Sequence, residues 1–238
     1  MPFSEQLKSQ IYDYCENHLA DADWYDAEFD FIEDSAMRER IIEEFRGVRF
    51  AYKLYEGIEA TGENLVFEIR HQILAYASIY EAIIHYVLYN YYQDTVEFHV
   101  MQYHTVPTRM SFCEKQMIEV KKILSKQSEN IYIYHDQERK KDESQVRFDD
   151  KCRAAEALGL VSRIITDLGE VIDLPSEIIE IYGYRNAIHL VAEQRKGLKY
   201  ELDLSKTAYR RMRPFIDQIK ACLERDRKSI YATRNDEV

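Results

Sequence analysis

An arginine and a histidine, Arg185 and His189, lie one helical turn apart in a helix that we expect to begin near Pro175. Leu174, Ile178 and other aliphatic residues form the apolar stripe of this helix, and Arg185 occupies a position where the pattern calls for an aliphatic side chain. A cation on an inward face needs a carboxylate, a second subunit or a phosphate as its partner. The pair therefore indicates either a buried ion-pair cluster or a functional site.

The segment Tyr184-Arg185-Asn186-Ala187-Ile188-His189-Leu190 resembles the motif helix of the HEPN superfamily. In that family an Arg, usually followed by Asn, Asp or His, precedes a His near the end of an all-helical domain. Four to six residues usually separate the two, and here three do. The earlier segment 76–83 also resembles the HEPN helix that packs beside the motif. The resemblance covers roughly residues 61–225.

The resemblance implies a metal-independent endoribonuclease that acts as a homodimer with a shared cleft and needs no cofactor. His189 would move the protons, because a histidine pKa lies near neutrality, and Arg185 would hold the phosphate as charge grows on it. Asn186 would orient the phosphate or the histidine. Glu81 would be the carboxylate partner of the motif, and Tyr184 would support it. Bacterial defence or a toxin–antitoxin-like setting is the expected context.

The last predicted helix is basic, with a net charge of +5 over residues 206–228. Four of its cations, Lys206, Arg210, Arg211 and Arg213, follow the motif closely enough to contact an RNA backbone. A solvated helix face is the other common meaning of such a run, and the sequence favours neither.

Other functions are open as well. A catalytically inactive HEPN-like module that dimerises or binds a partner would use Arg185 and His189 only structurally. A metal-dependent hydrolase would need an ion near Glu81 and His85, but we predict no metal site, because the chain lacks an H-E-x-x-H motif. Its four cysteines are far apart and predict neither a zinc site nor a disulfide framework.

Hydrophobic spacing and capping residues predict an all-α protein. The resemblance implies that it is a HEPN-like helical bundle with an N-terminal helical extension. We expect an acidic, aromatic stretch at 21–31, loops at 106–108 and 136–145, and short strands at 131–134 and 198–204. Helices are predicted at residues 4–19, 35–59, 63–92, 111–126, 148–158, 174–195 and 205–227.

Charge divides the chain unevenly. Residues 1–63 hold 16 Asp and Glu against 6 Lys and Arg, a net of −10 in a chain whose total is −11. We therefore predict an acidic extension at 1–60 that docks a partner or competes with RNA. The resemblance implies a HEPN-like domain at 61–238. The apolar run 72–92 contains polar residues that are costly in hydrocarbon, and no signal pattern opens the chain. We expect a cytoplasmic protein with RNA, a second copy and an antitoxin or regulatory protein as partners, and no membrane.

Overall fold

The structure is a computed structural model that describes residues 2–125, 130–166, 169–187, 194–195 and 197–231. Helices form most of it, and its strands belong to two small two-stranded sheets, as far as these ranges show. The predicted all-α class is thus confirmed. His189, the predicted catalytic histidine, lies outside the described residues.

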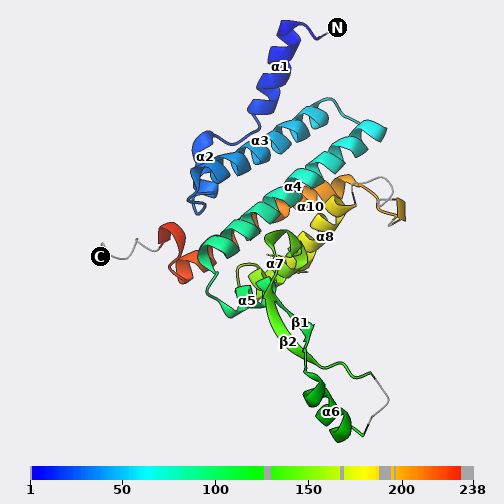
Figure 1. Cartoon of the computed structure of the whole chain (residues 1–238). Coiled ribbons are helices and arrows are strands. Elements are labelled where there is room, and N and C mark those ends of the chain that lie inside the picture. The colour runs from blue at the N-terminus through cyan, green and yellow to red at the C-terminus, as the bar shows by residue number, and fades with distance from the viewer. Residues whose placement is uncertain (1, 126–129, 167–168, 188–193, 196, 232–238) are drawn as a thin grey trace, which may run out of the picture.

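Helix α4 (Gly62–Tyr91) runs through the middle of the bundle (Figure 1). It packs against α3 (Ser35–Gly57), α7 (Phe148–Ala157), α8 (Leu174–Asn186) and α10 (Leu202–Arg225). Neighbours on several sides explain why apolar residues surround α4 and do not form one stripe. Although α4 is long, none of the helices in the described ranges combines the length and apolar character that crossing a membrane requires.

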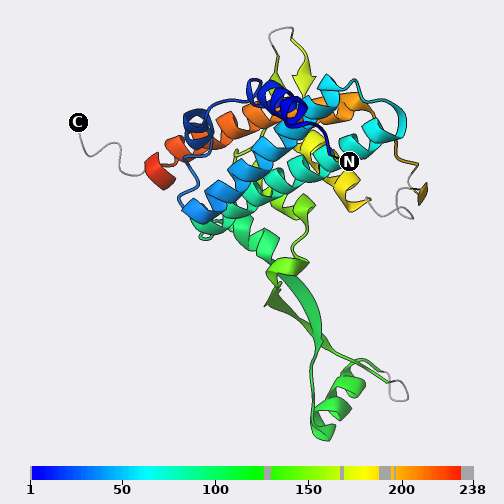
Figure 2. The same ribbon diagram turned by 90° about the horizontal axis from the view of Figure 1, so that it is seen from above.

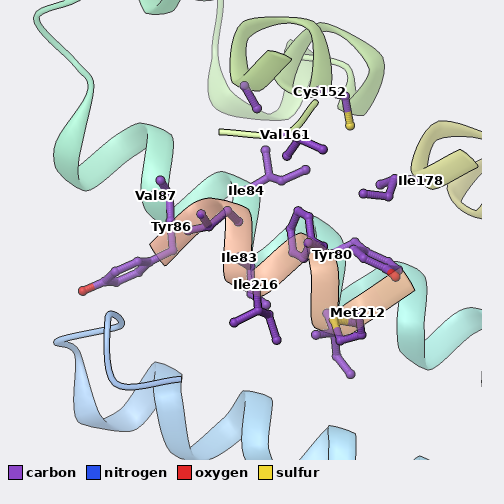
Figure 3. Close-up of a cluster of buried hydrophobic side chains, with 14 of the residues drawn as sticks. Tyr80, Ile83, Ile84, Tyr86, Val87, Cys152, Val161, Ile178, Met212 and Ile216 are labelled. Carbon is purple, nitrogen blue, oxygen red and sulfur yellow. The ribbon is translucent and has the colours of Figure 1, made fainter. Parts of the chain in front are cut away.

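The core lies where α4, α7, α8 and α10 meet (Figure 3). The Tyr80 hydroxyl inside this core donates a hydrogen bond of 2.8 Å to the Ala208 carbonyl oxygen of α10. This bond satisfies the one polar group of a fully buried ring. The side chains drawn around it come from all four helices and include Ile83, Ile84, Cys152, Ile178, Met212 and Ile216.

The acidic N-terminal region contains α1 (Glu5–Glu16) and a helix that the sequence did not predict, α2 (Ala22–Glu28). Asp21 caps α2, because its carboxylate accepts a 2.8 Å hydrogen bond from the Trp24 amide. The segment that includes α2 and the turn after it contributes four buried side chains to the main hydrophobic cluster: Tyr25, Phe29, Phe31 and Ile32. The domain boundary after residue 60 stays a prediction.

A narrow arm leaves the bundle after α5 (Val96–Gln102) and projects away from it in both views (Figures 1 and 2). It consists of β1 (Tyr103–Arg109), α6 (Glu114–Ile123) and β2 (Tyr134–Lys140), with β1 and β2 antiparallel. The loops predicted at 106–108 and 136–145 were therefore largely wrong, and only the last residue of the predicted strand 131–134 is in a strand. Every residue of β2 is exposed, so burial imposes no hydrophobic alternation on its sequence.

Hydrogen bonds close the arm at its base. The Gln102 side chain accepts one from the Tyr89 hydroxyl (2.6 Å) and donates one to the Lys141 carbonyl oxygen (2.5 Å). The Lys141 amide donates to the Gln102 carbonyl oxygen at 2.8 Å. The two ends of the arm are thus held together at one point of the bundle.

Two predictions near the motif were wrong. Helix α8 ends at Asn186, whereas the prediction continued it to residue 195; residues 188–193 of that stretch lie outside the described residues. At its end the Tyr184 carbonyl oxygen accepts hydrogen bonds from the Ala187 amide and the Tyr200 hydroxyl. The strand predicted at 198–204 is absent from the residues described there, and α10 already begins at Leu202.

Short elements complete the described chain. They are η1 (Glu143–Gln145), β3 (Ile164–Ile165), β4 (Val171–Ile172) and η2 (Ser229–Tyr231). Gly159 follows the end of α7 with a φ of +76°, in agreement with the predicted end of this helix at residue 158.

Candidate functional site

Helix α8 positions Arg185. The Asp173 carboxylate accepts a hydrogen bond from the Ser176 amide at the start of the helix. Leu174, Ile178 and Ile181 are at most 2% exposed, which confirms the apolar stripe. These contacts fix the rotation of α8, so Arg185 faces α4 at the end of the stripe.

Arg185, Tyr182 and Glu81 form a connected network. Arg185 Nη1 lies 3.1 Å from Glu81 Oε2 and donates a 2.5 Å hydrogen bond to the Tyr182 hydroxyl. That hydroxyl donates to Glu81 Oε1 at 3.0 Å. The guanidinium carbon also lies 4.9 Å from the centre of the Tyr182 ring. The Glu81 carboxylate therefore balances the positive charge of Arg185, and together with the Tyr182 hydroxyl it fixes the orientation of the guanidinium.

A cavity of about 400 Å³ opens beside this network, between α4, α7, α8 and the turn at η1. Glu81, Tyr182 and Asn186 line it, together with Lys151 of α7 and Glu143 of η1. The Arg185 side chain is 32% exposed and that of Glu81 is 27% exposed, so water and small ligands reach both. Arg185 is not itself among the lining residues, but its two partners Glu81 and Tyr182 are, and we call this cavity the Arg185 pocket.

Burial sets the proton affinities of the groups around the pocket. It raises the pKa of Tyr182 to about 12, and the Glu81 carboxylate adds to the effect. It lowers the pKa of the Lys151 ammonium, although Glu81 and Glu143 partly oppose the shift. The pKa of His85 is lowered as well, first by burial and then by Lys151. Tyr182 is a hydroxyl donor at neutral pH, and His85 is mostly uncharged there.

Only some of the predicted motif residues lie together in the structure. Glu81, Arg185 and Asn186 come together as predicted. Tyr184 faces elsewhere, with its ring 5.6 Å from that of Tyr200. Tyr182 was missed, although its position three residues before Arg185 placed it on the same helix face. Lys151 was missed too, because no sequence pattern connects α7 to the motif.

The four predicted RNA contacts divide into two pairs. Arg211 binds Glu177 of α8, with Nε 2.5 Å from Oε2. Arg213 lies 2.7 Å from Glu28 and 3.1 Å from Asp217. Arg211 and Arg213 therefore join helices within the chain. Lys206 and Arg210 line a different cavity, between α3, α4 and α10.

Metal-ligating side chains do not gather in groups of three or more His, Cys, Asp or Glu anywhere in the described ranges. His85 stacks on Tyr89, with ring centres 4.2 Å apart. His99 stacks on Tyr103 and lies 3.4 Å from Glu138.

Comparison of the chain with protein-family models, with curated proteins and with solved structures found no match.

Proposed function

We propose that this protein is a metal-independent endoribonuclease of the HEPN type, and that the Arg185 pocket is its active site. The observation that carries the proposal is the network in which Glu81 and Tyr182 hold a partly exposed guanidinium beside Asn186. A catalytic cation must be oriented before the substrate arrives, since reorganisation during the reaction would cost rate.

Arg185 retains donors for a substrate. The contacts to Glu81 and Tyr182 both use Nη1, whereas Nη2 and Nε make no hydrogen bond with the described residues. A guanidinium has five N–H donors, so the free edge is suited to two phosphate oxygens. Glu81 and Tyr182 are then positioning residues, and Arg185 is the group that contacts the phosphate.

The reaction is an attack of a ribose 2′-oxygen on the adjacent phosphorus. His189 accepts the 2′-hydroxyl proton or donates a proton to the departing 5′-oxygen, and Asn186 orients the phosphate or the histidine. Arg185 offsets the negative charge that grows on the phosphoryl oxygens. One P–O bond forms and one breaks, which leaves a 2′,3′-cyclic phosphate and a free 5′-hydroxyl.

The sequence resemblance adds the setting to this proposal. We infer a cytoplasmic homodimer that acts in defence or with an antitoxin-like partner protein. Balancing the Arg185 charge does not require a second subunit, because Glu81 of the same chain already does so. Light scattering at micromolar concentration tests the dimer, and a monomer mass would exclude an active site shared between subunits.

A catalytically inactive dimerisation or partner-binding module is the second candidate. The same ion pair favours it, because an arginine already matched by a carboxylate has a structural role without any RNA. This candidate predicts that the purified protein leaves RNA intact.

The test is incubation of purified protein with total RNA in EDTA. We expect cleavage to 2′,3′-cyclic phosphate ends, abolished by Arg185→Ala and by His189→Ala. Arg40→Ala is the matched control, because Arg40 is an exposed arginine of α3 far from the motif in the sequence. Cleavage that EDTA stops and magnesium restores would reject the mechanism. Intact RNA with the wild-type protein would favour the inactive module.

A further inference from the structure

A second pocket, of about 190 Å³, lies between α3, α4 and α10 and shares no lining residue with the Arg185 pocket. We call it the α3–α10 pocket. Arg49 and Lys53 of α3, Lys206 and Arg210 of α10, Tyr76 of α4 and Tyr209 of α10 are among its lining residues. The first four are cations, whereas Glu56 is the pocket's one acidic lining residue.

Three of these cations have no carboxylate to match them. Glu56 lies 2.6 Å from Lys53. Arg49, Lys206 and Arg210 make no ion pair within the part of the chain that the structure describes. The whole chain carries a net charge of −11, whereas the residues that line this pocket carry a net charge of +3. Such a concentration attracts anions.

Arg49 is held by aromatic rings. Its guanidinium carbon lies 3.7 Å from the centre of the Tyr209 ring and 5.0 Å from that of Tyr52. Stacking uses the faces of the guanidinium and leaves its N–H groups directed outward in the plane. This arrangement orients the donors before any ligand arrives.

The Tyr76 hydroxyl is a further donor at this pocket. Tyr76 is 0% exposed, and its hydroxyl has no partner among the described residues that meets hydrogen-bond geometry, although the Arg49 side chain lies close enough to lower its pKa in part. A buried hydroxyl without a partner is uncommon, because it has lost water and gained nothing in exchange. Burial raises the pKa of Tyr76, so the group stays protonated and able to donate.

We propose that the α3–α10 pocket binds the terminal phosphoryl group of a phosphomonoester, with Arg49, Lys206, Arg210 and the Tyr76 hydroxyl as its donors. A phosphomonoester dianion has three terminal oxygens and about two negative charges, which suits three unmatched cations and a neutral donor. A phosphodiester inside a nucleic-acid chain carries one negative charge, and the chain continues from it in both directions. The pocket has a volume of only about 190 Å³, which suits a terminal group better than a continuous backbone.

The site does not depend on the ribonuclease proposal, and its test measures binding alone. Titration calorimetry of the full chain at low salt would use inorganic phosphate, adenosine 5′-monophosphate and adenosine. It would also use two 2′-O-methyl oligonucleotides, one with a 5′-phosphate and one with a 5′-hydroxyl. These oligonucleotides lack the attacking 2′-hydroxyl, so cleavage cannot confuse the measurement.

We expect saturable binding of phosphate and the monophosphate, and none of adenosine. Arg210→Gln and Tyr76→Phe should each weaken binding about 3- to 30-fold. Tyr76→Phe removes only the hydroxyl oxygen of Tyr76, so we expect this variant to fold like the wild-type protein. Arg40→Gln removes a charge from an exposed part of α3 and should leave the affinity unchanged.

Two results would overturn the proposal. One is the absence of saturable binding, or equal affinities for the wild-type, Arg210→Gln and Tyr76→Phe proteins. The other is equally tight binding of the two oligonucleotides, which would assign the pocket to the backbone of a nucleic acid.

Discussion

The Arg185 pocket and the α3–α10 pocket share one helix and differ in how their cations are balanced. Glu81 of α4 lines the first pocket, and charged lining residues of that pocket act on the pKa of His85 of the same helix, whereas Gln72 and Tyr76 line the second. Tyr76 and Glu81 are five residues apart, which turns them about 140° from each other around the helix. One straight helix thus supplies walls to two separate sites.

Both arginines are held in a fixed orientation, but only the one without a carboxylate partner keeps a free positive charge that can attract an anion. The Arg185 guanidinium is fixed by a carboxylate and a hydroxyl, so it acts as an oriented group with little free charge. Arg49 is fixed by aromatic rings, which leave its charge unmatched. The first arrangement suits a residue that must be in place during a reaction, and the second suits one that must attract an anion.

The largest expected effect is on RNA cleavage. Arg185→Ala should reduce the rate about 100-fold or more, because a preorganised donor to the transition state is lost. Arg210→Gln should change it less than about 5-fold, since Arg210 lies at the other pocket. Rates of oligonucleotide cleavage in EDTA measure both effects. A greater loss in Arg210→Gln than in Arg185→Ala would reverse the assignment of the two pockets.

The next effect is on stability. Glu81→Ala leaves the half-buried guanidinium and the Tyr182 hydroxyl without their acceptor and should lower the free energy of unfolding by about 1–3 kcal/mol. Arg210→Gln should stay within about 0.5 kcal/mol, as for most exposed substitutions without a partner. Urea unfolding measures both variants. Equal losses would show that the carboxylate does not distinguish the two pockets.

Phosphate should raise the melting temperature by an intermediate amount. A ligand at ten times its Kd stabilises the folded state by about 1.4 kcal/mol, which corresponds to about 3–6 °C for a chain of this size. We expect this rise for the wild-type and Arg185→Ala proteins and a smaller one for Arg210→Gln, with chloride at equal ionic strength as the control. A rise that Arg185→Ala abolishes would place the anion in the other pocket.

The smallest effect concerns His85, beside the Arg185 pocket. Its pKa, lowered by burial and then by Lys151, should lie below 6.5 in an NMR titration, and Lys151→Met should move it upward. Between the folded-state pKa and 6.5, the unfolded chain binds more protons than the folded one. The His85 contribution to stability therefore decreases as the pH falls through that window. A pKa at or above 6.5 would contradict this description of the site.

Sequence patterns predicted the long helices whose apolar residues pack on the core. Helix α4 and most of α3 and α10 fall where the spacing placed them, because each packs on the core along its length. The exposed strand β2 gave no such pattern. The early end of α8 lacked a signal of another kind, since the Tyr184 carbonyl oxygen at this end accepts a hydrogen bond from the distant Tyr200, which no local pattern encodes.

The candidate site was predictable where the family resemblance named a residue. Glu81 and Arg185 lie in contact as expected, although they are 104 positions apart in the sequence. Lys151 and Glu143 reach the pocket only through the packing of α7 and η1, which no local pattern encodes. The pairing of Glu28 with Arg213 is equally non-local. Removing the acidic segment 1–34 would break this pair and would also take four buried aromatic and aliphatic side chains from the core.

Because its two ends are joined at the base, the arm at residues 103–140 is an insertion that is structurally separate from the bundle core. The chain leaves the bundle at Gln102 and returns at Lys141, where backbone and side-chain hydrogen bonds join the two ends. No residue of α6 or β2 is buried, so the bundle core does not depend on them. A short turn from Gln102 to Lys141 would preserve the bundle. The length and sequence of the arm are therefore under little constraint from the part of the protein that carries the two pockets.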